Sequence, residues 1–312
     1  MIVSLLGFLL RAVVVLAGTA VVTFALLWNA PGDPAQAIAL ARFDALVTED
    51  VIELVREEVG LDANFWTAFK NWVGPLLTLD FGHSAVTGRP VWPDLWAAIT
   101  YTLPLALVGL AIGLAISFPL AILATKRPGG WLDRFAVAIA SLGASIPAYW
   151  LGLLLILLFA VHLAWLPAMG ARTPAHAVLP ALTLGLGLAA SLTRIIRSGI
   201  LEAKGQPFLP AIRRRGVSSK NIARDHVAPH AAIPVVTVFG LELAFLLEGT
   251  VMVEVIFGRP GLGTFLVNAI EARDFPHVQA IVVLTALLFV TVNVIIDIVY
   301  KVIDPRIGQH DA

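Results

Sequence analysis

Long apolar stretches separated by shorter polar segments form the dominant pattern of this chain. Six of them are close to or above the roughly 20 residues that an α-helix needs to cross the hydrocarbon core of a bilayer. These stretches are residues 2–27, 100–124, 134–161, 177–196, 231–253 and 278–303. We interpret the first as a span and not as a secretory signal, because no basic residue precedes Arg11 and the apolar run is too long. The pattern therefore predicts an all-α membrane protein with six transmembrane helices.

The composition agrees with a membrane protein. Hydrophobic residues make up 59% of the 312 residues and charged residues 13%, and the mean hydropathy is +0.89, far above that of a soluble domain. The absence of cysteine excludes disulfides and thiolate metal sites. The formal net charge of zero gives no overall attraction to nucleic acid, so we expect membrane lipid and no nucleic acid around the chain.

The distribution of positive charge predicts which side each loop faces. If the N-terminus is cytoplasmic, two-thirds of the 21 lysines and arginines fall on the cytoplasmic side. Cytoplasmic loops carry an excess of these residues, so we expect both termini inside the cell. The long segment on the far side is then 29–99, which has ten acidic and four basic residues.

Two parts of this outer segment predict helices. Residues 48–60 have the pattern of a short amphipathic helix, with Thr48 as its cap, acids in its first turn and Gly60 as its stop. Residues 65–77 are aromatic enough to lie at the lipid interface. We therefore expect segment 29–99 to form a lid or collar.

Residues 200–231 are the most basic part of the chain, with cations at Lys204, Arg213, Arg214, Arg215, Lys220 and Arg224. Three interpretations compete: a loop that only fixes topology, a patch for anionic lipid, and a docking element for a cytoplasmic partner. The length favours docking, because about 30 residues exceed what a turn between spans requires. The pattern predicts a short helix, a break at Gly216 and a second short helix capped by Ser218 or Ser219.

Several motifs occur in an order and spacing that resemble one known family. They are "APGDP" at 30–34, "DFGHSAVTGRPV" at 80–91, "WLDRFAVAIASLGASIPAYWLGLLL" at 131–155, "WLPAMG" at 165–170, "IFGRPGLG" at 256–263 and "DPRIG" at 304–308. In addition, Gly216 is followed eighteen residues later by Pro234. Together these motifs cover nearly the whole chain and resemble the permease subunits of ABC importers, specifically their peptide and nickel branch.

The resemblance implies a fold and a division of the chain. We expect the type I ABC importer permease fold in a bacterial cytoplasmic membrane, with a long extracytoplasmic loop after the first helix. The expected parts are a first transmembrane helix at 1–28, that loop at 29–99, a five-helix core at 100–304 with a cytoplasmic coupling loop at 197–231, and a cytoplasmic tail at 305–312.

The resemblance also implies partners and site residues. The expected partners are a second homologous permease, cytoplasmic ABC ATPase subunits and an extracytoplasmic solute-binding protein. In the family the coupling loop forms a helix that fits a groove on the ATPase. The residues here that match this loop are Pro210, Ala211, Ile212, Arg213, Arg214, Arg215, Gly216, His226 and Pro229.

The chain departs from the family pattern in two places. Pro210, Ala211 and Ile212 stand where the motif has Glu-Ala-Ala, and Pro210 is able to begin a helix. Pro260 and Gly261 are gate candidates in a turn further along the chain. Before this turn, the pair at 258–259 replaces an expected Ser-Trp, a change that we expect to alter the outer gate.

The chain lacks a motif for using ATP itself. No G-x-x-x-x-G-K-[ST] string occurs, and the glycines at 258–263 lack the spacing and strand of a dinucleotide loop. We therefore expect a non-enzymatic subunit without catalytic residues or cofactor, with ATP hydrolysis in its partners.

Three glutamates follow each other at six-residue intervals in the fifth span. Such steps rotate by about 240°, so Glu242, Glu248 and Glu254 point in three directions. Glu248 lies about 20 Å along the helix from Pro234 and is our pathway candidate; the alternative is a carboxyl that is protonated or bonded to a neighbouring subunit. Glu254 is expected at the outer gate or in a structural role.

The sixth span also contains polar residues. Asn293 and Asp297 share one face of the sixth span, where we expect helix packing. An ion-driven secondary transporter, with Glu248 and Asp297 as a proton relay, is the alternative function from a different class.

The seven histidines are scattered, so we expect no metal site; they are His83, His162, His176, His226, His230, His277 and His310. We expect helices that bend at the prolines Pro104, Pro119, Pro147 and Pro180.

These observations predict the pore-forming subunit of an ATP-driven importer of di- or oligopeptides. The resemblance leaves nickel chelates, glutathione or another small solute such as a sugar as alternative cargo.

Overall fold

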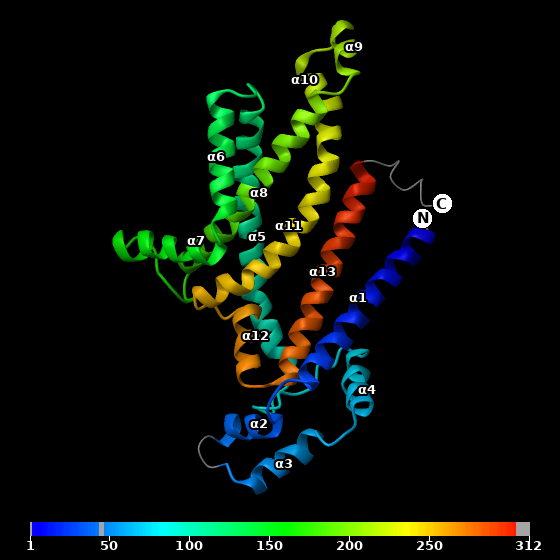
Figure 1. Ribbon diagram of the computed structural model, residues 1–312, viewed down its shortest axis with the longest axis vertical. Coiled ribbons are helices and arrows are strands. Elements are labelled where there is room, and N and C mark those ends of the chain that lie inside the picture. Colours follow the sequence, from blue (N-terminus) through cyan, green and yellow to red (C-terminus); the bar gives the residue numbers. More distant parts are fainter. Residues whose placement is uncertain (1, 44–46, 304–312) are drawn as a thin grey trace. The chain divides into compact units, whose positions relative to one another are not determined.

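The computed structural model describes residues 2–43 and 47–303 (Figure 1). Within these residues the chain is helical, and its β-structure is limited to one isolated bridge between His83 and Pro90. The all-α prediction is therefore confirmed. The predicted tail at 305–312 and the motif at 304–308 lie outside the described residues.

The helices belong to two compact units, Met1–Tyr101 with Pro260–Thr291 and Thr102–Arg259 with Val292–Ala312. The long helices α5 (Val91–Ala124) and α13 (Phe275–Ile303) contribute to both. The first unit also contains α1 (Ile2–Trp28), α2 (Pro34–Phe43), α3 (Glu49–Val59), α4 (Phe65–Leu76) and α12 (Leu262–Glu271). The second also contains α6 (Trp131–Ser145), α7 (Ala148–Leu155), η1 (Ile156–His162), η2 (Pro174–Ala177), α8 (Val178–Lys204), α9 (Leu209–Arg214), α10 (Ser219–Ile222), η3 (Ala223–Val227) and α11 (Ala228–Ile256).

The six predicted spans all correspond to helices. Four described helices are long and apolar enough to cross a membrane, and two bent pairs raise the number to six if each pair is one span. The boundaries differ mainly where helices run beyond the apolar stretch. Helix α5 already begins at Val91, and α8 continues to Lys204, into the polar segment that follows the apolar run.

The third predicted span is broken instead of continuous. Helices α6 and α7 meet at an angle of 101°. Ile146, between them, is extended with φ −88° and ψ 120°, because the residue before a proline is disfavoured in the helical region. Of the four prolines that we expected to bend helices, Pro147 lies directly after the end of α6. Helix α5 runs through Pro104 and Pro119, and Pro180 lies in the first turn of α8, where a missing N–H costs nothing.

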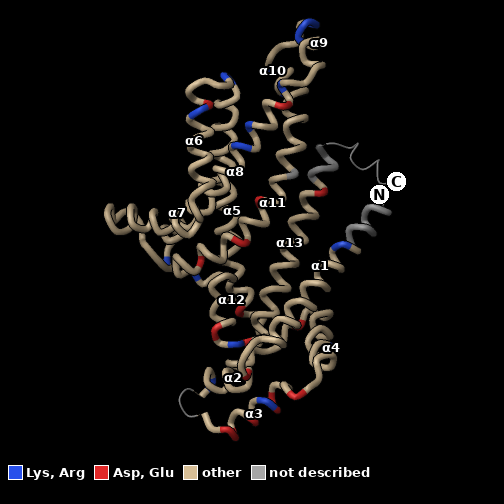
Figure 2. Tube along the Cα trace, in the orientation of Figure 1, with Lys and Arg blue, Asp and Glu red and all other residues tan. Residues whose placement is uncertain are grey.

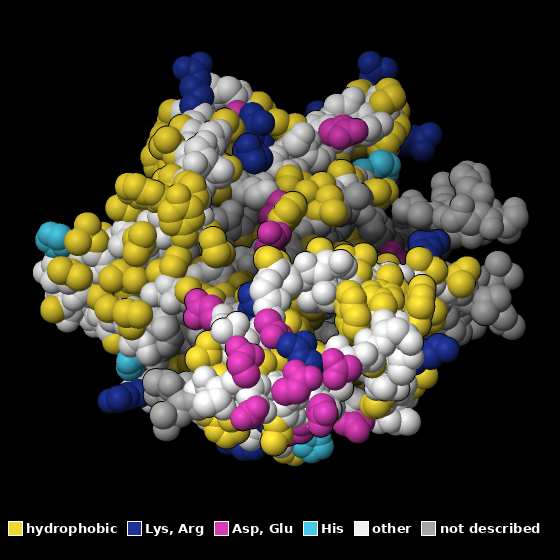
Figure 3. Space-filling model, turned by 60° about the horizontal axis from the view of Figure 1, so that its bottom comes forward, with side chains coloured by type: hydrophobic (Ala, Val, Ile, Leu, Met, Phe, Trp, Pro, Cys, Tyr) yellow, Lys and Arg dark blue, Asp and Glu magenta, His cyan; other side chains and the backbone are white. Residues whose placement is uncertain are grey.

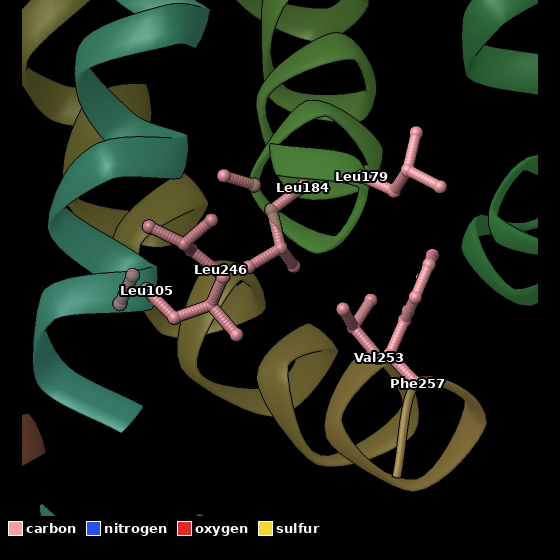
Figure 4. Close-up of a cluster of buried hydrophobic side chains, with 8 residues drawn as sticks. Leu105, Leu179, Leu184, Leu246, Val253 and Phe257 are labelled. Carbon is pink, nitrogen blue, oxygen red and sulfur yellow. The ribbon is translucent and has the colours of Figure 1, made fainter. Parts of the chain in front are cut away.

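Helix α8 is the centre of the second unit and packs against α6, α7 and α11. Figure 4 shows the buried side chains of this core, which come from α5, α8 and α11; they are Leu105, Leu179, Leu184, Leu246, Val253 and Phe257. Glycines bring the helices close together. A Cβ on Gly109 would lie 2.9 Å from the Cβ of Leu184, and a Cβ on Gly143 would lie 2.8 Å from that of Ala190.

The first unit contains the predicted outer helices. Helix α3 ends at Val59, before Gly60 with φ 72°, and begins after Thr48, as predicted, although the Thr48 side chain makes no capping hydrogen bond. It buries Ile52 and Val55 against α2. Helix α4 packs on the end of α1 through five aromatic rings: Phe24, Trp28, Phe65, Phe69 and Trp72. The location of α4 at the lipid interface stays a prediction.

Candidate functional site

The segment that connects α8 to α11 has a small apolar core of its own. Helix α9 contributes Leu209, α10 contributes Ile222, and the adjoining helix ends contribute Ala203 and Ala231, all nearly inaccessible to solvent. This segment is built as predicted. A short helix is followed by Gly216, whose φ of 77° suits glycine, and by a second short helix capped by the side chain of Ser218.

The apolar core leaves the cations of this segment on its surface. The side chains of Arg213, Arg214, Arg215, Lys220 and Arg224 are all exposed. Figure 2 shows basic residues at α9, on this connection. One of the five has an ion-pair partner among the described residues, since Arg224 lies 3.8 Å from Asp225. The other four cations have no ion-pair partner among the described residues.

The other residues that the resemblance assigned to this segment have different environments. Pro210 and Ala211 are exposed in α9, which begins one residue before Pro210. Ile212 packs partly against the apolar core. His226 is half-buried with its ring beside that of Phe208, and Pro229 is exposed in the first turn of α11.

The three glutamates of α11 have three environments, in agreement with the rotation that their spacing predicts. Glu254 is fully buried and accepts a hydrogen bond of 2.6 Å from the Thr102 hydroxyl of α5. Glu242 accepts a hydrogen bond from the Ser191 hydroxyl of α8. Glu248 is exposed. Its role in the pathway stays a prediction.

Gly249, the residue after Glu248, lies where α11 contacts α8. A Cβ on Gly249 would lie 3.4 Å from the Cδ2 of Leu184, so this position faces α8. Helix α11 also bends by 42° between Val236 and Val238, beyond the internal Pro234.

Asp297 of α13, the second residue of the alternative proton relay, is exposed as well. No described hydrogen bond or ion pair joins it to Glu248.

The departure at 258–259 has a structural explanation. Gly258 has φ 55°, a left-handed conformation that a serine adopts only with strain. Arg259 is 7% exposed and donates a hydrogen bond of 3.2 Å to the carbonyl of His176. The neighbouring Phe257 carbonyl accepts a hydrogen bond of 2.8 Å from the backbone N–H of Gly170. Two motifs that are far apart in the sequence, at 165–170 and 256–259, therefore meet in the second unit.

The turn that follows belongs to the first unit. Pro260 is exposed, and Gly261 is buried at the N-cap of α12. The glycine-rich string is therefore a turn at a helix start, as its sequence context predicts. The assignment of these two residues to an outer gate stays a prediction.

A buried polar network in the first unit was not predicted. The carboxylate of Asp274 accepts hydrogen bonds from the Ser84 hydroxyl at 2.5 Å, the Ala85 N–H at 3.0 Å and His277 Nδ1 at 2.7 Å. Burial raises the pKa of Asp274, but the hydrogen bonds from His277 and Ser84 outweigh burial and hold the pKa below its ordinary value. The network fixes residues 84–85 of the outer segment to the turn before α13.

The outer segment also exposes an acidic face on α3 and the turn after it. Its exposed acids are Glu49, Asp50, Glu53, Glu57, Glu58 and Asp62. Figure 3 shows acidic side chains gathered on one face of the molecule. Three ion pairs tie this region together, including Arg42 with Glu58 at 2.7 Å and Arg56 with Asp33 at 2.6 Å.

Sequence reasoning also missed an ion pair between Asp133 of α6 and Arg197 of α8. One signal was available, because Asp133 is the sole acidic residue between positions 125 and 201. Within the described part of the chain, no group of three or more His, Asp or Glu side chains is placed to hold a metal ion.

Comparison with known proteins adds a family. Residues 117–309 match the family described as binding-protein-dependent transport system inner membrane component, and residues 1–106 match the N-terminal family of such components. The chain is 38% identical over 295 residues to the glutathione transport system permease protein GsiC of Escherichia coli strain K12, covering 92% of each protein. It is also 38% identical over 296 residues to GsiC of Salmonella typhimurium strain LT2, covering 92% of this chain and 93% of that protein.

Solved structures share the fold. A chain of the MetNI methionine ABC transporter, in an inward-facing conformation, matches with a TM-score of 0.56 at 22% identity, covering 67% of this chain and 96% of that one. A chain of an amino acid ABC transporter crystallised with histidines matches with a TM-score of 0.54 at 18% identity, covering 67% and 94%.

Proposed function

The chain belongs to the family of inner membrane components of binding-protein-dependent transport systems, and on that premise we propose that it forms half of the membrane pore of an ATP-driven importer of short peptides. A second, homologous permease encloses the other side of the pathway. The coupling loop, residues 197–231, binds a cytoplasmic ATPase. The outer segment 29–99 receives an extracytoplasmic solute-binding protein, and both termini lie in the cytoplasm of a bacterial cell.

The observation that carries this proposal is the form of the coupling loop. Its short helices are held by buried Leu209 and Ile222, while Arg213, Arg214 and Arg215 are exposed on its surface. A loop that only fixed topology would need the charges but not the apolar core. A small, rigid, basic protrusion is suited to transmit a push or pull from a partner, because it moves as one piece with the helix ends on either side.

The proposed cargo rests on the chemistry of glutathione and on the names of the related permeases. Glutathione, which the related GsiC permeases are named for, is itself a small peptide. Short peptides are therefore a class that contains both the di- or oligopeptides expected from the sequence and the glutathione for which the relatives are named. We propose glutathione and dipeptides as the first cargo to test, with nickel chelates and sugars as comparison solutes in the same assay.

Family membership also bears on the alternative of ion-driven transport. That alternative needs Glu248 and Asp297 to act as one relay, and no described interaction joins them. An ABC importer instead takes its energy from separate ATPase subunits, in keeping with a chain that has no phosphate-binding loop of its own.

The test is uptake by proteoliposomes that contain this chain, its partner permease and the ATPase subunits, with the binding protein added outside. We expect glutathione or dipeptide to accumulate only when ATP and the binding protein are both present. A protonophore should leave the uptake unchanged. Vigorous uptake by liposomes that contain this chain alone would contradict the proposal.

A variant tests the role of the coupling loop itself. Replacing Arg213, Arg214 and Arg215 together by glutamine should leave insertion intact and uncouple ATP hydrolysis from uptake, because the contact surface for the ATPase is lost. The matched control replaces Lys126 and Arg127, exposed cations of the preceding predicted inner loop, by glutamine. If the triple variant transports as well as this control, the coupling loop is not the docking element.

A further inference from the structure

The first turn of α6 is bonded to α8 by a partly buried ion pair. Arg197 of α8 donates from Nε to Oδ1 of Asp133 at 2.5 Å and from Nη2 to Oδ2 at 2.8 Å. The same carboxylate accepts a hydrogen bond of 2.8 Å from the backbone N–H of Gly129, in the α5–α6 connection. The Asp133 side chain is 4% exposed and that of Arg197 26%. This is a two-point contact in which the carboxylate, but not the guanidinium, has little access to water.

A second bond joins α8 to the other end of the α5–α6 connection. Lys204, the last residue of α8, donates from Nζ to the carbonyl oxygen of Thr125 at 2.7 Å. Thr125 directly follows α5. Arg197 and Lys204 are seven residues apart, so they lie on one face of α8 about 10 Å from each other. Two attachments at that separation restrain the position of α8 more than a single one would. We name this set, Thr125, Asp133, Arg197 and Lys204, the inner clamp.

The inner clamp lies where α8 enters the coupling loop. Ala203, next to Lys204, belongs to the same buried core as Leu209 and Ile222 of the coupling loop. The C-terminal end of α8 therefore has two sets of fixed neighbours, the coupling loop through apolar contacts and the α5–α6 connection through the inner clamp.

We propose that the inner clamp makes the inner ends of α5 and α6 follow α8 when the ATPase displaces the coupling loop, with Arg197 as the positioning residue. This inference rests on the proposed function, because it assigns a path to the movement that ATP hydrolysis drives. The clamp carries this movement into the helices beside the pathway, so its loss separates hydrolysis from transport.

The chemistry of the contact is suited to this task. A fork of two parallel hydrogen bonds fixes the orientation of the guanidinium on the carboxylate, which a single charge does not. Separation of the pair would leave Asp133 buried without its counter-charge, and such a state is strongly disfavoured. An apolar contact of equal area is able to slide, whereas this one is either made or broken.

Four variants in the complete transporter test the inference. Arg197→Ala removes the fork, and Arg197→Lys keeps the charge and is the milder change if the alanine variant does not fold. Asp133→Arg combined with Arg197→Asp exchanges the partners. Arg194→Ala is the matched control, because Arg194 lies one turn earlier on α8, exposed and in no described ion pair.

The readout is solute transported per ATP hydrolysed, measured in proteoliposomes. We expect this ratio to fall for Arg197→Ala by a factor in the range of about 5 to 150 that is typical of couplings between sites. Hydrolysis itself should continue. The ratio for Arg197→Lys should be intermediate, the exchange should restore part of it, and Arg194→Ala should match wild type. If hydrolysis and uptake fall in proportion, Arg197 is merely structural and the proposal is overturned.

A distance measurement on the purified chain separates this inference from the proposed function. The chain has no cysteine, so Pro128→Cys and Lys220→Cys place spin labels on the α5–α6 connection and the coupling loop without further changes. We expect a narrow distance distribution in wild type and a broad one in Arg197→Ala. Equal distributions would overturn the clamp even if the wild-type complex transports. Failure of wild-type transport with a narrow distribution would instead overturn the proposed function, and with it the role of the clamp, but not the contact itself.

Discussion

The close contact between α5 and α8 depends on Gly185, and its replacement by alanine gives a sharp test of the fold. A Cβ at this position would lie 2.6 Å from Cγ2 and 2.7 Å from Cβ of Ile112, and 3.0 Å from the carbonyl oxygen of Gly109. Two of these three atoms belong to backbone or to a Cβ, which rotation of a side chain does not move. Ile112 is also β-branched and holds one preferred rotamer in a helix.

The size of the effect follows from these distances. Carbon atoms in contact prefer separations of about 3.5–4.0 Å, so Gly185→Ala forces α5 and α8 apart locally by roughly 1 Å. A gap of that size forfeits a quarter to a half of the dispersion energy of the contacts that it opens. Insertion of an extra methyl group into a well-packed core costs about 1–3 kcal/mol, and we expect the upper part of this range because backbone has to move.

Gly187 provides a matched control two residues further along α8. No atom lies within 4 Å of a Cβ built at this position. Gly187→Ala should therefore leave stability unchanged or raise it by up to about 1 kcal/mol, the usual gain of alanine over glycine within a helix. Free energies of unfolding in mixed micelles measure both variants. If Gly185→Ala is as stable as Gly187→Ala, α5 and α8 are not packed as described.

Three further predictions concern single sites. Gly258→Ala should lower the free energy of unfolding by about 1 kcal/mol or more, because φ is 55° there; an unchanged denaturation midpoint would contradict this. Thr102→Val should lower it by about 1–3 kcal/mol, because Glu254 loses a buried hydrogen bond, whereas Thr102→Ser should keep most of the stability. The lowered pKa of Asp274 contributes stability above its unfolded pKa of about 4, and this contribution is lost as pH falls through the folded value. Asp274→Asn should therefore flatten the loss of stability below about pH 4, as followed by unfolding midpoints across pH; an unchanged profile would show that other groups control it.

The elements that the sequence predicted well are those that depend on local pattern. A span is recognised by the length of its apolar run, and the form of the coupling loop follows from Gly216 and Ser218, whose effects extend over a few residues. The break at Ile146 was not singled out, because four prolines gave the same signal. Pro104 and Pro119 are accommodated within α5, whereas Pro147 lies where α6 ends.

Contacts between distant residues were not predictable in this way. Asp133 and Arg197 are separated by 64 positions. Nothing in the neighbourhood of either residue identifies the other, and the charge count assigned both regions only to the inner side. Thr102 gave no signal either, since a threonine within an apolar helix usually bonds its own backbone. Pairing of this kind is decided by how helices pack.

The three glutamates of α11 give an argument for a second permease that is independent of the resemblance. Within the chain, Glu254 is buried with a donor from α5 and Glu242 has a donor from α8. Glu248 is exposed within a membrane-spanning helix, and ionisable side chains in that environment almost always face a partner or a water-filled path instead of lipid. The neighbouring Gly249 already faces α8, whereas Glu248 has no hydrogen bond or ion pair among the described residues. A homologous subunit that encloses a wet pathway would give Glu248 such surroundings, which supports the proposal that one copy of this chain is an incomplete pore.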